Sequence, residues 1–137
     1  MADLTRTAAK VAAVFRTESL VLDIETSVTV GAGEAVAIGT DGKLDLADGS
    51  TGGNALATRG IALRDGVAGD VIPVLIRGGL EGFDVSSIDG DAPVYVSGAN
   101  TGELADGAGA VSKIVGTVFL IPGTSDKIIW IDVPWAN

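Results

Sequence analysis

Short apolar runs dominate this chain, each rich in valine or isoleucine and bounded by glycine, aspartate or asparagine. Such runs predict β-strands joined by tight turns, because β-branched side chains suit a pleated sheet while Gly, Asp and Asn suit turns. The pattern leaves little room for helix. Strands are predicted at residues 34–39, 43–47, 57–65, 70–78, 92–98, 113–123 and 127–135.

A further strand is predicted at the stretch SLVLDIETSVTV, residues 19–30, which alternates between two faces. Leu20, Leu22 and Ile24 share one face of an extended chain, and the alternation changes phase near Thr26. A single extra residue in a strand turns every following side chain to the other face, so the phase change predicts a bulge or bend at Thr26.

The clearest turn signal is the sequence TDGK between Gly39 and Leu44. It contains Asp41 and Gly42, a dipeptide favoured in two-residue hairpin loops because both central residues need a positive φ. Asp41 and Gly42 are therefore predicted to be structural turn residues that join two antiparallel strands.

The chain then repeats itself, since GEAVAIGTDGKL at residues 33–44 resembles GDAPVYVSGANTGEL at residues 90–104. In each stretch a Gly and an acid precede an apolar run. A turn follows the run, and each turn has a Gly two residues before a Leu. In the second stretch this Gly is Gly102, which is therefore predicted to be a structural turn residue like Gly42. The similarity continues with Gly60 and Gly116, giving similar halves at about residues 33–66 and 90–123. The matched pairs are Gly33 with Gly90, Glu34 with Asp91, Val36 with Val94, Ile38 with Val96, Gly39 with Gly98, Gly42 with Gly102 and Leu44 with Leu104. Independent hairpins of similar composition are the alternative explanation.

Two copies are too few for a solenoid, so the halves are expected to pack on each other. We therefore predict an all-β fold: one compact antiparallel β-barrel or sandwich-like domain at residues 19–137, built from two similar halves and preceded by an extended N-terminal arm, residues 1–18. Pro73 interrupts an apolar run, and because proline cannot donate to a central ladder its strand is predicted to lie at an edge. Pro93 comes early in its own run, where the missing donor costs less.

Residues 1–17 of the predicted arm carry Arg6, Lys10 and Arg16 against a single acid, Asp3. One interpretation is a short amphipathic helix, and the other is an extended segment that stays disordered until it meets a partner. The second is favoured because an isolated helix of this length is marginal in water. A third interpretation, in which the arm covers its own barrel or a sister subunit, stays open. The helical stripe would consist of Ala8, Val11, Ala12 and Phe15.

The amino-acid composition argues against several classes of function. The chain has 137 residues with no Cys and no His, so it lacks thiol chemistry, the usual general base near neutral pH and the commonest metal ligand. Its net charge of −9 opposes binding to nucleic acid or to anionic lipid, and no apolar run approaches the roughly 18 residues of a membrane span. Lys10 interrupts the apolar stretch near the N-terminus, so no secretory signal is expected.

The acidic loops are the remaining place for chemistry, either as Ca²⁺ ligands or as a pair of carboxylates for glycoside hydrolysis. The spacing of an EF-hand is missing, and Asp beside Gly is ordinary turn chemistry. We therefore expect structural turns, no cofactor, no metal and no enzyme. The acids concerned are Asp41, Asp45, Asp48, Asp84, Asp89 and Asp91.

Three stretches together resemble the head decoration (capsid cement) proteins of tailed bacteriophages: GEAVAIGTDGKL, RGIALRDGVAGDVIPVLIRGGLEG and GDAPVYVSGANTGEL, between residues 33 and 104. The resemblance implies a structural virion protein that binds the outer surface of the head and braces neighbouring subunits of the major capsid protein, often as a trimer. It would be made in the host cytoplasm. The resemblance brings no catalytic residue with it.

Two groups of residues are expected to make contacts in that role. The basic arm would reach carboxylates of the capsid, and the large side chains near the C-terminus would be covered by a neighbour in a cyclic homo-oligomer, trimer before dimer. The capsid-contact candidates are Arg6, Lys10, Phe15 and Arg16, and the oligomer-interface candidates are Trp130, Pro134 and Trp135.

A β-sandwich module that binds a ligand or carbohydrate is the alternative function. It requires a platform of exposed aromatic rings, and the chain has two Trp, one Tyr and three Phe. A small hydrolase using carboxylates would require two acids that converge in a cleft.

Overall fold

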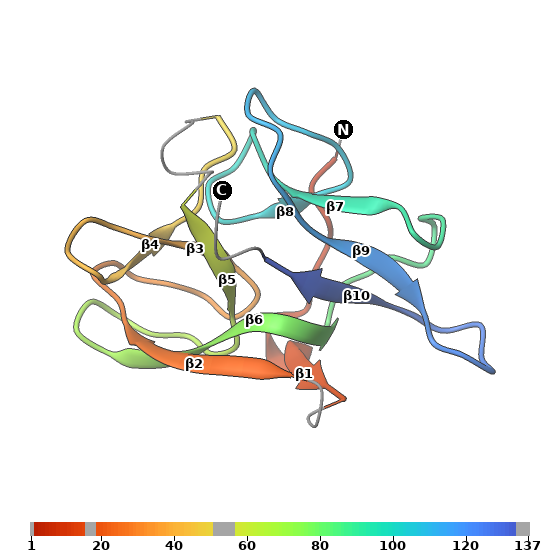
Figure 1. Ribbon diagram of the computed structural model, residues 1–137, viewed down its shortest axis with the longest axis horizontal. Helices are drawn as coiled ribbons and strands as arrows, with labels where there is room; N and C mark the ends of the chain where they lie inside the picture. The colour runs from red at the N-terminus through yellow and green to blue at the C-terminus, as the bar shows by residue number, and fades with distance from the viewer. Residues whose placement is uncertain (1, 16–18, 51–56, 134–137) are drawn as a thin grey trace.

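The computed structural model describes residues 2–15, 19–50 and 57–133 of the chain. One 3₁₀ turn, η1, and ten β-strands make up its regular structure, so the predicted all-β class is confirmed (Figure 1). The elements are η1 (Ala8–Lys10), β1 (Ala12–Val14), β2 (Leu20–Glu25), β3 (Ala35–Ile38), β4 (Leu44–Leu46), β5 (Thr58–Ala62), β6 (Val71–Glu81), β7 (Pro93–Val96), β8 (Leu104–Ala105), β9 (Ile114–Leu120) and β10 (Lys127–Asp132).

All ten strands belong to one curled antiparallel sheet in the order β4-β3-β5-β6-β10-β9-β7-β8, with β1 and β2 paired to β6 as well (Figure 1). The long strand β6 is central, because β2, β1, β5 and β10 all pair with it. The curl gives the half-barrel seen in Figure 1.

The two predicted halves have the same strand pairing. β3 lies between β4 and β5, and β7 lies between β8 and β9. Val36 is opposite Gly60 in one half and Val94 is opposite Gly116 in the other, and a register shift follows each pair. The two halves therefore share their register and the position of a bulge.

The repeat extends beyond the residues that the sequence matched. Leu22 of β2 pairs with Val74 in the first part of β6, and Leu80 in the second part of β6 pairs with Ile129 of β10. The strand β6 therefore ends one unit and begins the next. We call residues 20–77 the first unit and residues 78–132 the second unit, with Gly78, at φ 137°, where they meet.

One detail of the predicted alignment is wrong by a single residue. The position of Gly33, with φ 91°, is taken in the second unit by Asp91, with φ 68°, rather than by Gly90. The backbone N–H of each donates to the neighbouring strand, to the carbonyls of Ala62 and Val118 respectively, both at 2.8 Å. The second unit has one more residue between its acid and its first valine, so matching like letters shifted the start of the alignment.

Two apolar clusters form the core. The first lies within the first unit, between β2 and the strands β3 to β6. The second joins the inner face of the second unit to the opposite face of the first unit, and it also includes Leu4 and Val11 from the N-terminal segment. Burial of this many β-branched and leucine side chains is the main stabilising term.

The bend predicted near Thr26 is confirmed, since β2 ends at Glu25 and Thr26 makes an isolated bridge with Leu44. The prediction of an edge strand at Pro73 is wrong, because Pro73 lies in the central strand β6, opposite Asp23. Leu63, just beyond the end of β5, donates its N–H to the Pro73 carbonyl at 2.9 Å. A proline fits there because the regular ladder of β5 with β6 ends at Ala62 and Val74.

The N-terminal segment also differs from the expectation of a detached, disordered arm. Asp3 bridges Ala105, Arg6 bridges Phe83, and β1 pairs with the end of β6. Leu4 and Val11 are each 8% exposed within the core. The described part of this segment covers its own barrel because it supplies apolar side chains and backbone hydrogen bonds that the curled sheet lacks at that edge.

Candidate interaction surfaces

Asp41 and Gly42 lie in the turn between β3 and β4, and Gly102 lies in the turn between β7 and β8, but Asp41 does not have the positive φ that was expected at both central residues. Gly42 and Gly102 have φ values of 77° and 83°, in the region that favours glycine. The Asp41 carboxylate accepts the backbone N–H of Lys43 at 3.0 Å, which closes the first turn. Gly42 lies at an exposed hairpin tip, whereas Gly102 is buried and its N–H donates to the Ala47 carbonyl of the first unit at 2.7 Å.

Arg6, a capsid-contact candidate, is used inside the molecule. It forms an ion pair with Glu103 and donates through Nε to the Ala32 carbonyl at 3.0 Å. A β carbon at Gly33 would lie 2.5 Å from Arg6 Cδ, so the side chain passes directly over that glycine. Arg6 therefore links the N-terminal segment to both units, and the expectation that its charge is free to seek a capsid carboxylate is wrong.

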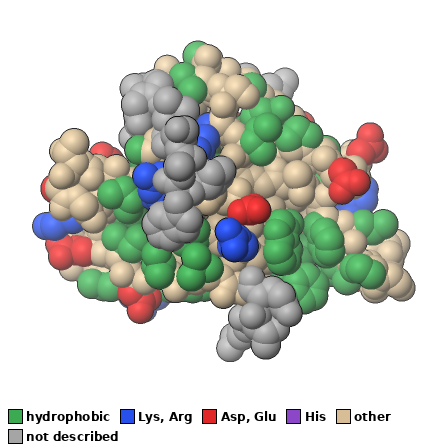
Figure 2. Space-filling view, viewed as in Figure 1, with side chains coloured by type: hydrophobic (Ala, Val, Ile, Leu, Met, Phe, Trp, Pro, Cys, Tyr) green, Lys and Arg blue, Asp and Glu red, His purple; other side chains and the backbone are tan. Residues whose placement is uncertain are grey.

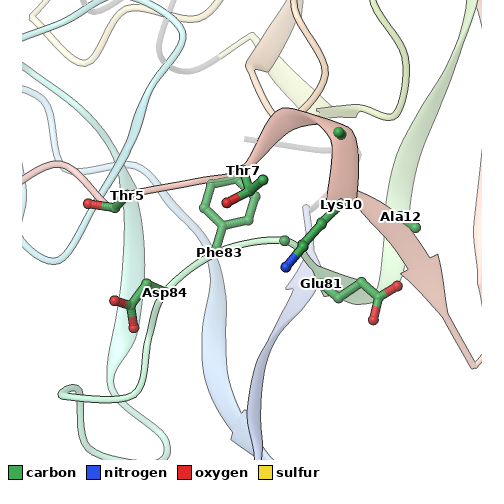
Figure 3. Close-up of a pocket in the computed structure, with 9 residues that line it drawn as sticks. Thr5, Thr7, Lys10, Ala12, Glu81, Phe83 and Asp84 are labelled. Carbon is green, nitrogen blue, oxygen red and sulfur yellow. The ribbon is translucent and has the colours of Figure 1, made fainter.

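Lys10, the second basic candidate, is exposed beside an open hollow of about 530 Å³. Figure 3 shows Lys10 and Phe83 on its wall, with the carboxylate of Glu81 turned away from the Lys10 amine. No side chain lining it is buried. The remaining residues that line it are Thr5, Thr7, Ala9, Ala12, Gly82 and Asp84.

Asp84, on the rim of this hollow, has a structural role. Its carboxylate accepts the hydroxyl of Ser86 at 2.7 Å and the Ser86 backbone N–H at 3.2 Å. These two hydrogen bonds hold the pKa of Asp84 below its ordinary value of 3.8. Asp41 and Asp48 accept turn hydrogen bonds in the same way.

An apolar, partly exposed surface of the second unit lies over β9 and β10. Thr117 is opposite Trp130, and Phe119 is opposite Ile128, so these side chains share one face of the sheet. Ile114 on the same strand is 46% exposed. Figure 2 shows hydrophobic side chains grouped over these two strands. We call this surface, formed by Ile114, Thr117, Phe119, Trp130 and the adjoining Phe15, the β9–β10 face.

Three aromatic rings meet on this face. Phe15 and Phe119 have centroids 6.4 Å apart with planes at 84°, and Phe119 and Trp130 have centroids 5.8 Å apart with planes at 47°. Phe15 is 41% exposed and packs over Gly79, where no side chain separates it from the sheet. The edge-to-face geometry is that of a packed cluster, with part of its surface open to a partner.

Three other candidates lie outside the described residues: Arg16, Pro134 and Trp135. Trp130 and Phe15, which the sequence assigned to an oligomer interface and to a capsid contact, are brought together on one face. The sequence pattern did not single out Ile114 and Phe119. Residues 114–120 alternate between two faces of a strand, which could have indicated these outward-facing side chains. The register shift of β9 against β7, between Val94 and Tyr95, interrupts that alternation, so the sequence alone did not show which residues face outward.

Within the described ranges, no group of three His, Cys, Asp or Glu residues is placed to hold a metal ion. No helix among the described residues is long and apolar enough to span a membrane. Comparisons of the chain with family models, with curated proteins and with solved structures found no match.

Proposed function

We propose that this chain is a structural virion protein that binds the outer surface of a tailed-phage head and stabilises contacts between subunits of the major capsid protein. The observation that supports it most is the equivalence of the two hairpins that carry the sequence resemblance. Residues 33–44 and 90–104 form β3–β4 and β7–β8, which have the same register in the two units. The stretches that suggest the family are thus the repeated framework of the fold.

The architecture is suited to a capsid cement protein. Its N-terminal segment is already fixed to the barrel through Leu4 and Arg6, so little conformational entropy is lost when a partner binds. Identical weak contacts repeated over a lattice give strong retention through effective concentration. A rigid body with an exposed, charged β3–β4 hairpin tip and an apolar face on β9 and β10 supplies such contacts without needing a catalytic cleft.

Binding to undecorated tailed-phage heads tests the proposal. Purified protein is mixed with heads, and bound protein is measured by co-sedimentation and located by electron microscopy. Ordered density at repeated positions on the outer surface is expected. Heads that pellet without the protein across a range of protein and salt concentrations would contradict the proposal.

A matched pair of variants sharpens the experiment. Lys10→Gln removes an exposed cation of the N-terminal segment and should weaken head binding most at low salt, because screening already reduces its contribution at high salt. Lys43→Gln is the control, since Lys43 lies on the β3–β4 hairpin and pairs with Glu25 at 2.9 Å. Equal loss in both variants would argue against a specific role for the N-terminal segment.

A carbohydrate-binding module is the second candidate, because Phe15, Phe119 and Trp130 gather on an exposed face. The rings are inclined at 84° and 47° to their neighbours, whereas a sugar-stacking platform needs faces that lie flat to the ligand. Glycan-array binding accompanied by a change in tryptophan fluorescence would favour this candidate over the capsid proposal.

A further inference from the structure

The chain contains five aspartates that are followed directly by glycine, and the structure sets one of them apart. In such a pair the glycine backbone nitrogen can attack the carboxyl carbon of the aspartate, because glycine has no side chain to obstruct the approach. The attack requires a glycine N–H that is not held in a hydrogen bond, and a carboxylate that is free to turn toward it. The five pairs begin at Asp41, Asp48, Asp65, Asp89 and Asp106.

Three of the pairs are held at both groups. The carboxylates of Asp41, Asp48 and Asp65 each accept a backbone N–H. The glycine N–H groups of the same pairs donate to backbone carbonyls, so at least two hydrogen bonds have to break before the reaction can begin. These bonds join Gly42 to the Gly39 carbonyl at 3.0 Å, Gly49 to the Ser97 carbonyl at 2.9 Å and Gly66 to the Val30 carbonyl at 2.9 Å.

The pair that begins at Asp106 is held through its aspartate. Asp106 Oδ1 accepts the backbone N–H of Ala2 at 2.7 Å, and the Asp106 N–H donates to the Ala2 carbonyl at 3.0 Å. These two hydrogen bonds fix the carboxylate against the N-terminal segment. It is therefore not free to turn toward the nitrogen of Gly107.

Asp89 and Gly90 meet both requirements. Both residues are exposed, and neither the Asp89 carboxylate nor the Gly90 N–H makes a hydrogen bond to any described residue. A β carbon at Gly90 would have nothing within 4 Å, so open space surrounds the nitrogen. The Asp89 carbonyl accepts the Ala92 N–H at 3.2 Å. This hydrogen bond closes the turn and leaves the nitrogen of Gly90 accessible to the carboxylate.

We propose that Asp89 converts spontaneously to isoaspartate, in preference to the other four aspartates, while the chain is folded. The Gly90 nitrogen bonds to Cγ of Asp89, and one carboxylate oxygen leaves as water with the amide proton and a proton from solvent. Water then opens the five-membered succinimide at either carbonyl, and a proton returns to solvent. Opening at the backbone carbonyl leaves the chain running through Cβ and Cγ, so the net change is an isomerisation without a cofactor. This inference does not depend on capsid binding.

The product changes the turn before β7. Isoaspartate at residue 89 adds one methylene group to the backbone, between the anchored residues on either side. On one side Lys127 Nζ donates to the Ile88 carbonyl at 2.6 Å. On the other, Asp91 has a φ of 68°, which is uncommon for a residue with a side chain. The new α-carboxylate is also the group that protein isoaspartate methyltransferases esterify, which makes the product measurable.

Ageing of the folded chain tests the proposal. Purified protein is kept for weeks near neutral pH, and a methyltransferase of this kind transfers labelled methyl groups from S-adenosylmethionine to the isoaspartate formed. Electron-transfer fragmentation of tryptic peptides assigns it to positions. We expect about tenfold more at Asp89 than at any other site, because a hydrogen bond has to break first at the other four. Comparable amounts at the five sites, or none at Asp89, would overturn the proposal.

Two controls separate the effect of the fold from that of the local sequence. In urea the hydrogen bonds are lost, so the five sites should react at similar rates, and a preference for Asp89 that persists there would overturn the structural argument. Asp89→Glu keeps the charge but requires a six-membered ring, so methylation of the folded chain should fall to background. Asp41→Glu is the matched control and should keep the methylation of the unaltered chain. The reverse result in these two variants would place the reaction elsewhere and contradict the proposal.

Discussion

A β carbon at position 116 would lie 2.1 Å from the carbonyl oxygen of Trp130, so Gly116 brings β9 against the backbone of β10 more closely than any other residue allows. In the first unit, a β carbon at Gly60 would lie 2.3 Å from the carbonyl oxygen of Leu75. The two glycines occupy the same position of the repeat, opposite Val36 and Val94. The repeat thus preserves a close approach of backbones.

Gly60→Ala and Gly116→Ala should each destabilise the fold, by about 2 kcal/mol or more, because the neighbouring strand has to move to admit the methyl group. Gly90→Ala is the control, since nothing lies within 4 Å of a β carbon there. Urea unfolding of the three variants measures the free energies. A large loss at one of the two sites only would argue that the units are not equivalent at this position.

Alanine substitutions at the turn glycines should destabilise the fold to different extents. Gly42 and Gly123 have positive φ and open space, so alanine at either should cost about 1 kcal/mol from backbone strain alone. At Gly102 a β carbon would also lie 2.8 Å from the Glu34 carboxylate, so alanine there should cost more. Melting midpoints rank the three variants, and a Gly102 variant as stable as the Gly42 variant would contradict the packing around Glu34.

The N-terminal segment should contribute to stability. Leu4→Ala removes a side chain that is 8% exposed in the core, and a loss of about 2 kcal/mol is expected. Arg6→Gln should also lower the melting midpoint, because Glu103 loses its ionic partner. Thr5→Ala, on the exposed side of the same segment, is the control. Unfolding midpoints unchanged in the Leu4 and Arg6 variants would favour a detached arm.

Local patterns predicted much of this fold. The β-branched runs located most strands, and glycine spacing located the repeat. The N-terminal segment was not predictable from local pattern, because Arg6 finds its partner Glu103 97 residues further along the chain. The position of Pro73 was misjudged for a related reason: whether a missing donor matters depends on where β5 ends, and only the tertiary pairing defines that.

The candidate surface was predictable only in part. Trp130 stood out as a large side chain in a terminal strand, but its neighbours Phe119 and Ile114 come from β9, whose facing depends on a register shift against β7. A shift of one residue reverses every side chain after it, so alternation alone could not assign the face.

The last prediction concerns Lys113, which is 6% exposed. Burial, and next the nearby charge of Arg59, lower the pKa of Lys113 from its ordinary value of 10.5. Between the lowered pKa of the folded state and 10.5, the unfolded chain holds more protons at this site, so the free energy of unfolding should rise with pH through that window. Urea unfolding at a series of pH values measures the slope. The Lys113→Met variant should have a smaller slope, whereas Lys10→Met, at an exposed site, should keep the slope of the unaltered chain. Equal slopes in the Lys113→Met variant and the unaltered chain would show that Lys113 keeps its ordinary pKa in the folded state.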